Sequence, residues 1–423
     1  MAENSSKVYY GFYVVAGLFV LMLPASLIMS AASIFYTPVT EELGISLAAY
    51  GVNLSIIQIG CALCVPTIFS AMCRKIKMRY VLTIALLVEV VFFALRAVAT
   101  NIWMFYISSV FLAMPMAMFF NLSIQILMTA WFPFNPGTFI GIVGCAQGLG
   151  GLAFSSLGGI IIQNFGWRIC FWSWAGICLV MVPIAFFVIR NSPAEKNIQP
   201  FGSDKSQNIA EKSVISGGVA ANKAFRTPAF IMIVLALFLS TFVGNYHGYI
   251  NAYIRTLGFS AGVAGTIYGV IQAGTLFYKL TIGTIADKSM KGGVLYYMVS
   301  TLVCFCLFIF GGANVVFMVL ACFLWGGIYA ATNLYGPLIV KHLFGLKDFI
   351  KIWSVVVGCW TVAGAAGAIV WGVIVEATSF RTGFVIALIL SAVILVTFML
   401  ALSQAKKTKL MWITEESEVS TAS

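Results

Sequence analysis

The sequence predicts an all-α membrane protein whose twelve transmembrane helices form two six-helix halves. Of its 423 residues, 61% are hydrophobic and only 9% are charged, whereas about a quarter of the residues are charged in a soluble domain. Twelve apolar stretches each approach or exceed the ~20 residues that one bilayer crossing requires. One long polar stretch, residues 191–226, divides these segments six and six.

The apolar segments follow one another with short polar turns between them. Several contain a proline, which a membrane helix tolerates because neighbouring helices satisfy the freed carbonyl groups. Nine of the ten cysteines lie in these segments, where we expect them to pack as small hydrophobic side chains. The predicted helices span residues 8–35, 46–69, 80–98, 103–130, 138–162, 168–189, 228–250, 261–285, 293–311, 314–340, 350–375 and 382–402.

Basic residues indicate how the bundle is oriented. With the N-terminus in the cytoplasm, nineteen of the 24 lysines and arginines fall on the cytoplasmic side and four on the other. This bias predicts that both termini are cytoplasmic. It also explains the net charge of +11 without a nucleic-acid partner. The predicted outer loops are short and hold no glycosylation sequon, which favours a bacterial inner membrane.

The predicted domain organisation follows from the polar stretches. Residues 1–190 form the first bundle, 191–226 a flexible cytoplasmic linker, 227–405 the second bundle and 406–423 a cytoplasmic tail. No GxxxxGK[ST] nucleotide-binding loop occurs, which argues against ATP-driven pumping. We expect no enzyme activity, no cofactor and no metal site, with the lipid bilayer as the surrounding medium.

Lys279 is the one basic residue deep inside an apolar segment. It lies eight residues before Asp287, where the polar turn begins, and therefore about 12 Å into the bilayer core. A cation at such a depth costs ~2.5–3.5 kcal/mol on insertion scales, so it needs an anion or a water-filled cavity. The alternative is that its long side chain extends to the lipid headgroups.

The end of this segment carries a recognisable motif. Residues 283–288, GTIADK, resemble the cytoplasmic loop motif G-x-x-x-D-[RK] of the major facilitator superfamily. The resemblance implies a twelve-helix transporter with its site near the midplane, between two halves. It also implies a conformational latch formed by Gly283, Asp287 and Lys288, although an ordinary solvated turn is the alternative. In the first-half copy, Ser70 and Arg74 replace the glycine and the acid.

Within this superfamily, the chain resembles the oxalate–formate antiporter and monocarboxylate transporter group. The resemblance rests on local sequences distributed along most of the chain, among them YTPV at 36–39, WFP at 131–133, GWR at 166–168, RTLG at 255–258 and WGGIYA at 325–330. It implies that Lys279 replaces an anion-binding arginine. The second cation of the oxalate carrier corresponds to Val356 here, so one carboxylate is expected rather than two.

The resemblance also implies the remaining substrate-binding residues. The first, fourth, seventh and tenth segments line the cavity in this architecture, and Trp325 and Tyr329 would enclose the substrate. The other polar candidates on these segments are Asn121, Gln125, Asn245 and Tyr246. Ordinary helix packing is the alternative for all of them, because interhelical polar contacts are common.

Two further titratable residues lie inside predicted helices. Glu89, in the middle of the third segment, is a possible proton site, although a neutral structural role is favoured because that segment is peripheral in this architecture. His247 is expected to line the cavity or an interface. It cannot share a metal with the only other histidine, His342, which lies on the opposite side of the membrane.

These features predict a monomeric secondary transporter of a small organic monoanion, a monocarboxylate, that works by alternating access. A proton or a counter-anion would accompany the substrate, as symport or exchange. Two alternatives stay open at this level. One is an exporter of drug-like or amphiphilic compounds, and the other is a membrane receptor or scaffold that does not transport.

Overall fold

The computed structural model describes residues 9–119, 122–202, 218–331, 335–345, 347–405 and 408, and most of these residues lie in helices. The first half comprises α1 (Tyr10–Ala25), α2 (Tyr36–Leu43), α3 (Leu47–Cys64), α4 (Ser70–Lys75), α5 (Met78–Ala97), α6 (Ile102–Phe119), α7 (Leu122–Trp131) and α8 (Pro136–Phe187). The second half comprises α9 (Ala221–Ala224), α10 (Pro228–Gly244), α11 (His247–Thr256), α12 (Ala261–Lys288), α13 (Met290–Phe310), α14 (Val315–Ala330), α15 (Gly336–Phe344), α16 (Phe349–Ala377) and α17 (Phe380–Ser403).

The predicted twelve-helix membrane fold is confirmed. Eight stretches of the described chain are long and apolar enough to cross a membrane, and α1 and α14 are shorter apolar helices. The 52 residues of α8 contain two crossings, because Gly166 has a positive φ of 83° and breaks the helix. Helix α12, with 28 residues, is the remaining membrane crossing.

The first and the seventh predicted segments are each broken within the described residues. The first segment ends as α1 after Pro24 and continues as a 3-10 turn (Ala32–Phe35) and α2. The seventh consists of α10 and α11, separated by Asn245 and Tyr246. The pieces beyond these two breaks pack against each other, since α11 contacts both the 3-10 turn and α2. The breaks therefore bring the two halves together.

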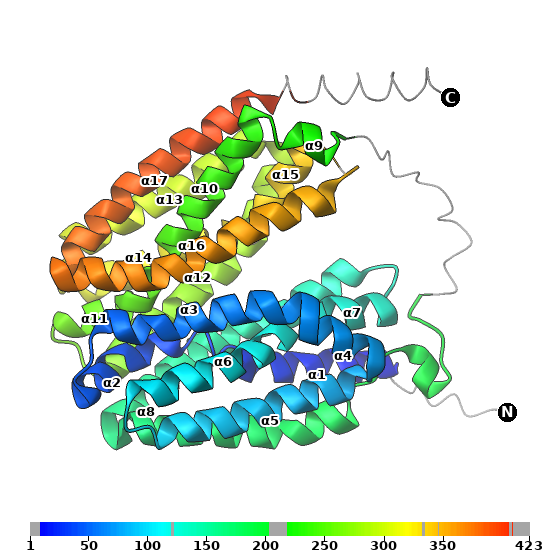
Figure 1. Cartoon of the computed structure of the whole chain (residues 1–423), viewed down its shortest axis with the longest axis horizontal. Coiled ribbons are helices and arrows are strands. Elements are labelled where there is room, and N and C mark those ends of the chain that lie inside the picture. Colours follow the sequence, from blue (N-terminus) through cyan, green and yellow to red (C-terminus); the bar gives the residue numbers. More distant parts are fainter. Residues whose placement is uncertain are drawn as a thin grey trace.

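Figure 1 shows the two halves as two layers of helices that meet at one end and diverge toward the other. We call the end where α1 begins and α17 ends the near side, and the opposite end the far side. Helix α3 meets α16, and α8 meets α12, so these two pairs form the principal contacts between the halves. The charge pattern of the sequence predicts that the near side is cytoplasmic.

Small residues let α3 and α16 cross at close range on the far side. A Cβ atom added to Gly51 would lie 2.4 Å from the carbonyl oxygen of Ala368, and one added to Gly372 would lie 2.5 Å from Cα of Ala48. Both distances are too short for any side chain. The contact therefore requires glycine at these two positions, as in other close crossings of membrane helices.

Glycines allow the same close packing between α8 and α12. An added Cβ at Gly159 would lie 2.6 Å from the carbonyl oxygen of Ala261, and one at Gly265 would lie 2.4 Å from that of Ser155. Toward the near side, a Cβ at Gly148 would be 3.6 Å from the nearest atom, and Gly144 and Gly141 would meet nothing within 4 Å. The distance between α8 and α12 thus increases from the far side toward the near side.

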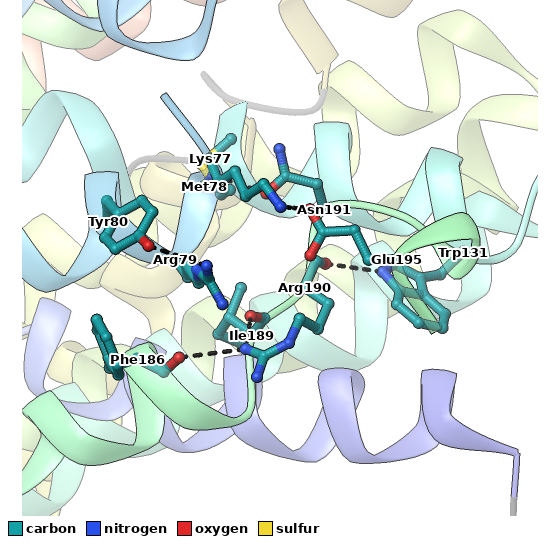
Figure 2. Close-up of polar contacts among 10 residues, drawn as sticks. All are labelled: Lys77, Met78, Arg79, Tyr80, Trp131, Phe186, Ile189, Arg190, Asn191 and Glu195. Atoms are coloured by element: carbon teal, nitrogen blue, oxygen red, sulfur yellow. Dashed lines mark hydrogen bonds and ion pairs between the residues drawn. The ribbon is translucent and has the colours of Figure 1, made fainter. Parts of the chain in front are cut away.

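The chain after α8 folds back on the near side of the first half (Figure 2). The Lys77 ammonium pairs with Glu195 at 3.3 Å, and the Asn191 amide oxygen accepts a hydrogen bond of 2.7 Å from the backbone N–H of Met78 at the start of α5. The indole of Trp131 donates to the carbonyl oxygen of Arg190 at 3.0 Å. These contacts attach the start of the predicted linker to the ends of α5 and α7.

The other end of the predicted linker is attached to the second half. The backbone N–H of Val219 donates to the carbonyl oxygen of Phe344, and that of Ala221 donates to the Asp348 carboxylate, both at 2.9 Å. The hydrogen bond from Ala221 is the main cause that lowers the pKa of the Asp348 carboxyl below its usual value. Residues 203–217, between the two attachments, lie outside the described part of the chain.

Candidate functional site

Lys279 lies on the side of α12 that faces the other half. Gly269 and Gln272, ten and seven residues earlier, occupy the same face of the helix and pack against Leu152 and Gly151 of α8. The Lys279 side chain is exposed, and its ammonium lies within electrostatic range of the Cys145 thiol, also on α8. Among the described residues it forms no ion pair and no hydrogen bond. An unpaired cation is thus present where α8 and α12 separate.

Helix α14, which carries Tyr329, packs directly against the part of α12 that precedes Lys279. Gly274 and Gly326 bring the backbones of α12 and α14 into direct contact, and an added Cβ at Gly327 would lie 3.3 Å from the ring of Tyr278. Lys279 follows Tyr278, and Tyr329 is two residues beyond Gly327. The cation and the phenol therefore belong to adjacent turns of neighbouring helices, with Tyr329 only partly buried.

Tyr329 is hydrogen-bonded to His247, the first residue of α11. Its hydroxyl oxygen is 2.8 Å from Nε2 and 2.9 Å from Nδ1 of the imidazole, and the two rings meet edge to face. Nδ1 is also 3.0 Å from the carbonyl oxygen of Gly244. Because a carbonyl only accepts, the contact with Gly244 indicates that Nδ1 carries the proton of the neutral ring. The Tyr329 hydroxyl is nearly equidistant from the two ring nitrogens and therefore does not lie along the lone pair of Nε2.

Asn245 connects the halves at the break between α10 and α11. Its side-chain oxygen accepts a hydrogen bond of 2.9 Å from the Gln58 amide of α3, and its amide donates to the carbonyl oxygen of Thr241 at 2.9 Å. Asn245 thus lies beside His247 and contacts the first half directly. Of the predicted site residues, Tyr329 and Asn245 therefore meet at this break through His247, whereas Lys279 lies near Cys145, where α12 and α8 separate.

Trp325 and Tyr246 lie inside the second half instead. Trp325 is fully buried against Phe305 and Phe308, and its indole N–H has no hydrogen-bond partner. Tyr246 is also fully buried, and its hydroxyl donates to the carbonyl oxygen of Phe380 at 2.8 Å. In this conformation both residues support the helices around the site, and neither presents a polar group to it.

The other predicted residues lie apart from this region or outside the described residues. Gln125, on α7, is exposed, whereas Asn121 lies outside the described residues. Glu89 is fully buried inside the first half, where one carboxylate oxygen accepts from the Cys178 thiol at 3.2 Å and the other has no partner. Of the predicted latch, Lys288 is exposed in the last turn of α12. Gly283 and Asp287 belong to the same helix end, and the Asp287 side chain lies outside the described part of the structure.

The far side holds polar contacts between the halves that the sequence did not reveal. The carboxylate of Glu376, at the end of α16, accepts a hydrogen bond of 2.9 Å from the backbone N–H of Ala48 in the first turn of α3. The Arg255 guanidinium of α11 lies 4.0 Å from the Glu41 carboxylate of α2. A carboxylate at a helix N-terminus is stabilised by the unpaired N–H groups and by the helix dipole.

We expect the Glu376→Gln substitution to weaken the far-side contact. The substitution keeps the size of the side chain but removes its charge, which is worth about 0.3–1 kcal/mol at a helix N-terminus. The population with a separated far side should rise about two- to fivefold. Spin labels at Thr100 and Ala313 in a cysteine-free background would report this as a longer distance.

Glu42→Gln is the matched control, because Glu42 pairs with Arg168 within the first half. An identical distance distribution for Glu376→Gln and wild type would contradict the role of Glu376.

His247 was predicted to line the cavity or an interface, but its tyrosine partner comes from a helix 82 positions away and was not predicted. Gln58 and Glu376 are polar residues in or at the end of apolar segments, a pattern that in hindsight indicates interfaces. Their partners depend on how the halves meet, which no local pattern encodes. Among the described residues, no group of three or more histidine, cysteine or acidic residues could hold a metal.

Comparison with known proteins adds the family context. The family model of the Major Facilitator Superfamily matches residues 15–345 of the chain. The fold is similar to that of the nucleoside transporter NupG, with a TM-score of 0.73 and 15% identity over 93% of this chain and 99% of that chain. It is also similar to a bacterial homolog of the human lysosomal transporter Spinster in an inward-facing, unoccupied conformation. There the TM-score is 0.67, with 13% identity over 96% of this chain and 98% of that chain. No curated protein sequence matches the chain.

Proposed function

Because the chain belongs to the Major Facilitator Superfamily, we propose that this multi-pass membrane protein is a secondary transporter of a small organic monoanion, a monocarboxylate. The transporter fold supports the first part of the proposal. The choice of substrate rests on one observation, the unpaired Lys279 ammonium between α12 and α8. Alternating access would expose this site to the two sides of the membrane in turn.

The lone cation explains why closure of the transporter would depend on bound substrate. Closing the near side would enclose Lys279 between the halves, and an enclosed cation without a partner is costly. A bound carboxylate supplies the partner, so the loaded carrier closes more readily than a carrier with an unpaired cation. A ligand shifts a conformational equilibrium only through such a difference in affinity between the two states.

The surroundings of Lys279 favour one carboxylate over two. Val356, where the resemblance would place a second cation, is an apolar and fully buried residue of α16. Tyr329, Asn245 and Gln58, at the break between α10 and α11, are neutral polar groups that can form hydrogen bonds with a monoanion but cannot neutralise a second charge. A dicarboxylate would therefore keep one charge unpaired.

Counterflow in proteoliposomes tests this function. Vesicles loaded with one unlabelled compound should accumulate the same labelled compound when the carrier exchanges it. The panel comprises formate, acetate, lactate and pyruvate, the dicarboxylate oxalate, uridine as a nucleoside, and the cationic dye ethidium. We expect accumulation of one or more monocarboxylates and little of the others.

Protein-free vesicles measure leakage of the free acids and are the control. Counterflow of uridine or ethidium without any carboxylate would contradict the proposal and would favour a nucleoside carrier or an exporter of amphiphilic compounds. Binding of a carboxylate without any exchange would favour a receptor.

A further inference from the structure

Two arginine side chains meet at the near end of α5 and α8 (Figure 2). Arg79, in the first turn of α5, places its guanidinium carbon 5.8 Å from the centre of the Phe186 ring. Arg190, which follows α8, donates from Nη1 to the carbonyl oxygens of Phe186 at 3.2 Å and Ile189 at 2.7 Å. Both cations therefore contact the end of the same helix.

Among the described residues, no carboxylate pairs with either guanidinium. Glu195, the acid drawn in Figure 2, is instead paired with Lys77 at 3.3 Å. Arg79 donates from Nη2 to the Tyr80 hydroxyl at 2.9 Å, and its buried Nε has no partner. A guanidinium has five N–H donors, so both arginines retain donors for a further ligand. An anion bound to both would also remove the repulsion between their charges.

The backbone positions that carry the two arginines are fixed relative to each other. The carbonyl oxygen of Arg190 accepts a hydrogen bond of 3.0 Å from the indole of Trp131. Its neighbour Asn191 accepts one of 2.7 Å from the backbone N–H of Met78, which directly precedes Arg79. A ligand that binds both guanidiniums would therefore meet a preorganised pair, which lowers the entropic cost of binding.

The surface next to the two arginines is aromatic and apolar. The rings of Tyr80 and Phe186 meet edge to face, and each of these residues is 37% exposed. Aromatic side chains at the ends of membrane helices lie at the level of the lipid headgroups. Farther along α5 and the second crossing of α8, the exposed residues include Ile84, Leu87, Val91, Leu179, Val180 and Phe187. This surface therefore faces lipid, and the arginines lie where the phosphates of the bilayer begin.

The charges around the two arginines favour an anionic lipid over a zwitterionic one. Lys75, Lys77 and Lys196 are exposed on the same side of the first half. Basic clusters at the end of a membrane helix attract anionic headgroups. Phosphatidylcholine has an ammonium group beside its phosphate, which these cations would repel.

We propose that Arg79 and Arg190 bind the phosphate of an anionic glycerophospholipid of the near-side leaflet, while Tyr80 and Phe186 pack against its glycerol and first acyl carbons. The exposed apolar surface beside the cations favours a lipid phosphate over a free one. Helix α5 provides none of the principal contacts between the halves, which involve α3 with α16 and α8 with α12. The lipid site is therefore separate from the site proposed for the substrate.

Native mass spectrometry of the detergent-purified protein tests this site. The probes are dioleoylphosphatidylglycerol, which is anionic, and dioleoylphosphatidylcholine, which has the same acyl chains. We expect the wild type to retain the anionic lipid in preference to the zwitterionic one. A basic side chain near the membrane surface strengthens binding of an anionic lipid about fivefold. Arg79→Gln and Arg190→Gln should therefore each weaken binding of phosphatidylglycerol by about fivefold.

Arg226→Gln is the matched control, because Arg226 is an exposed arginine on the near side of the second half. It makes the same change in net charge and should retain phosphatidylglycerol as the wild type does. Arg79→Lys keeps the charge but loses the planar fork that matches a phosphate, so we expect intermediate binding.

Equal retention of the two lipids by the wild type would overturn the proposal, and this comparison does not depend on the folding of any variant. A loss in Arg226→Gln as large as that in Arg79→Gln would also overturn it, because net charge alone would then explain the preference. Displacement of phosphatidylglycerol by millimolar inorganic phosphate would assign the arginines to a free anion and would contradict the choice of a lipid.

Discussion

The Lys279→Gln variant is expected to lose carboxylate binding by at least about a hundredfold. Glutamine is similar in length and polar, but it has no charge to balance an enclosed anion. Removing one partner of a buried ion pair costs ~3–5 kcal/mol, because the other charge is left unpaired. This corresponds to about two to four orders of magnitude in the dissociation constant. Isothermal titration calorimetry with the carboxylate that shows the strongest counterflow would measure the change.

Two further variants separate charge from shape at this position. Lys279→Arg keeps the charge but changes the geometry of hydrogen bonding, so we expect partial binding. Lys279→Glu should bind no anion at neutral pH. Lys291→Gln removes an exposed lysine of α13 and is the matched control. If Lys279→Gln bound carboxylates with wild-type affinity, Lys279 would be a residue that reaches the lipid headgroups, and the proposed site would be wrong.

The Gly51→Leu variant is expected to separate the far side of the two halves. A Cβ at this position would meet the backbone of Ala368, which cannot move without α16. Overpacking of a tight contact costs about 1–3 kcal/mol, which corresponds to a roughly 5- to 150-fold change in the ratio of the two conformations. The distance between spin labels at Thr100 and Ala313 should lengthen, and counterflow should fall.

Gly176→Leu is the control for this experiment, because an added Cβ at Gly176 meets nothing within 4 Å. It introduces the same side chain into α8 without a clash. An unchanged distance in Gly51→Leu would mean that the close crossing of α3 and α16 is not what closes the far side.

The helical membrane fold could be predicted because each crossing depends on local composition. Stretches of about 20 apolar residues are required by the thickness of the bilayer, whatever their neighbours are. The breaks within the segments were harder to predict. Asn245 and Tyr246 separate α10, which ends at Gly244, from α11, and Asn245 at this break is hydrogen-bonded to Gln58 of the first half, a contact that local sequence does not predict.

The candidate site was predictable only in part. Lys279 stands out in the sequence because a cation in an apolar segment is unusual. Trp325 and Tyr329 look equivalent in sequence, one helical turn apart, yet one is fully buried and the other meets His247. That difference depends on which neighbours α14 meets, so it could not be derived from spacing. Whether these residues bind substrate stays a prediction.

A structure determined with a bound monocarboxylate would test the central proposal most directly. The account predicts the carboxylate between α8 and α12, within about 4 Å of the Lys279 ammonium, with Tyr329 close enough to donate a hydrogen bond to it. A carboxylate bound elsewhere in the protein, with the Lys279 side chain directed to the lipid headgroups, would contradict the account.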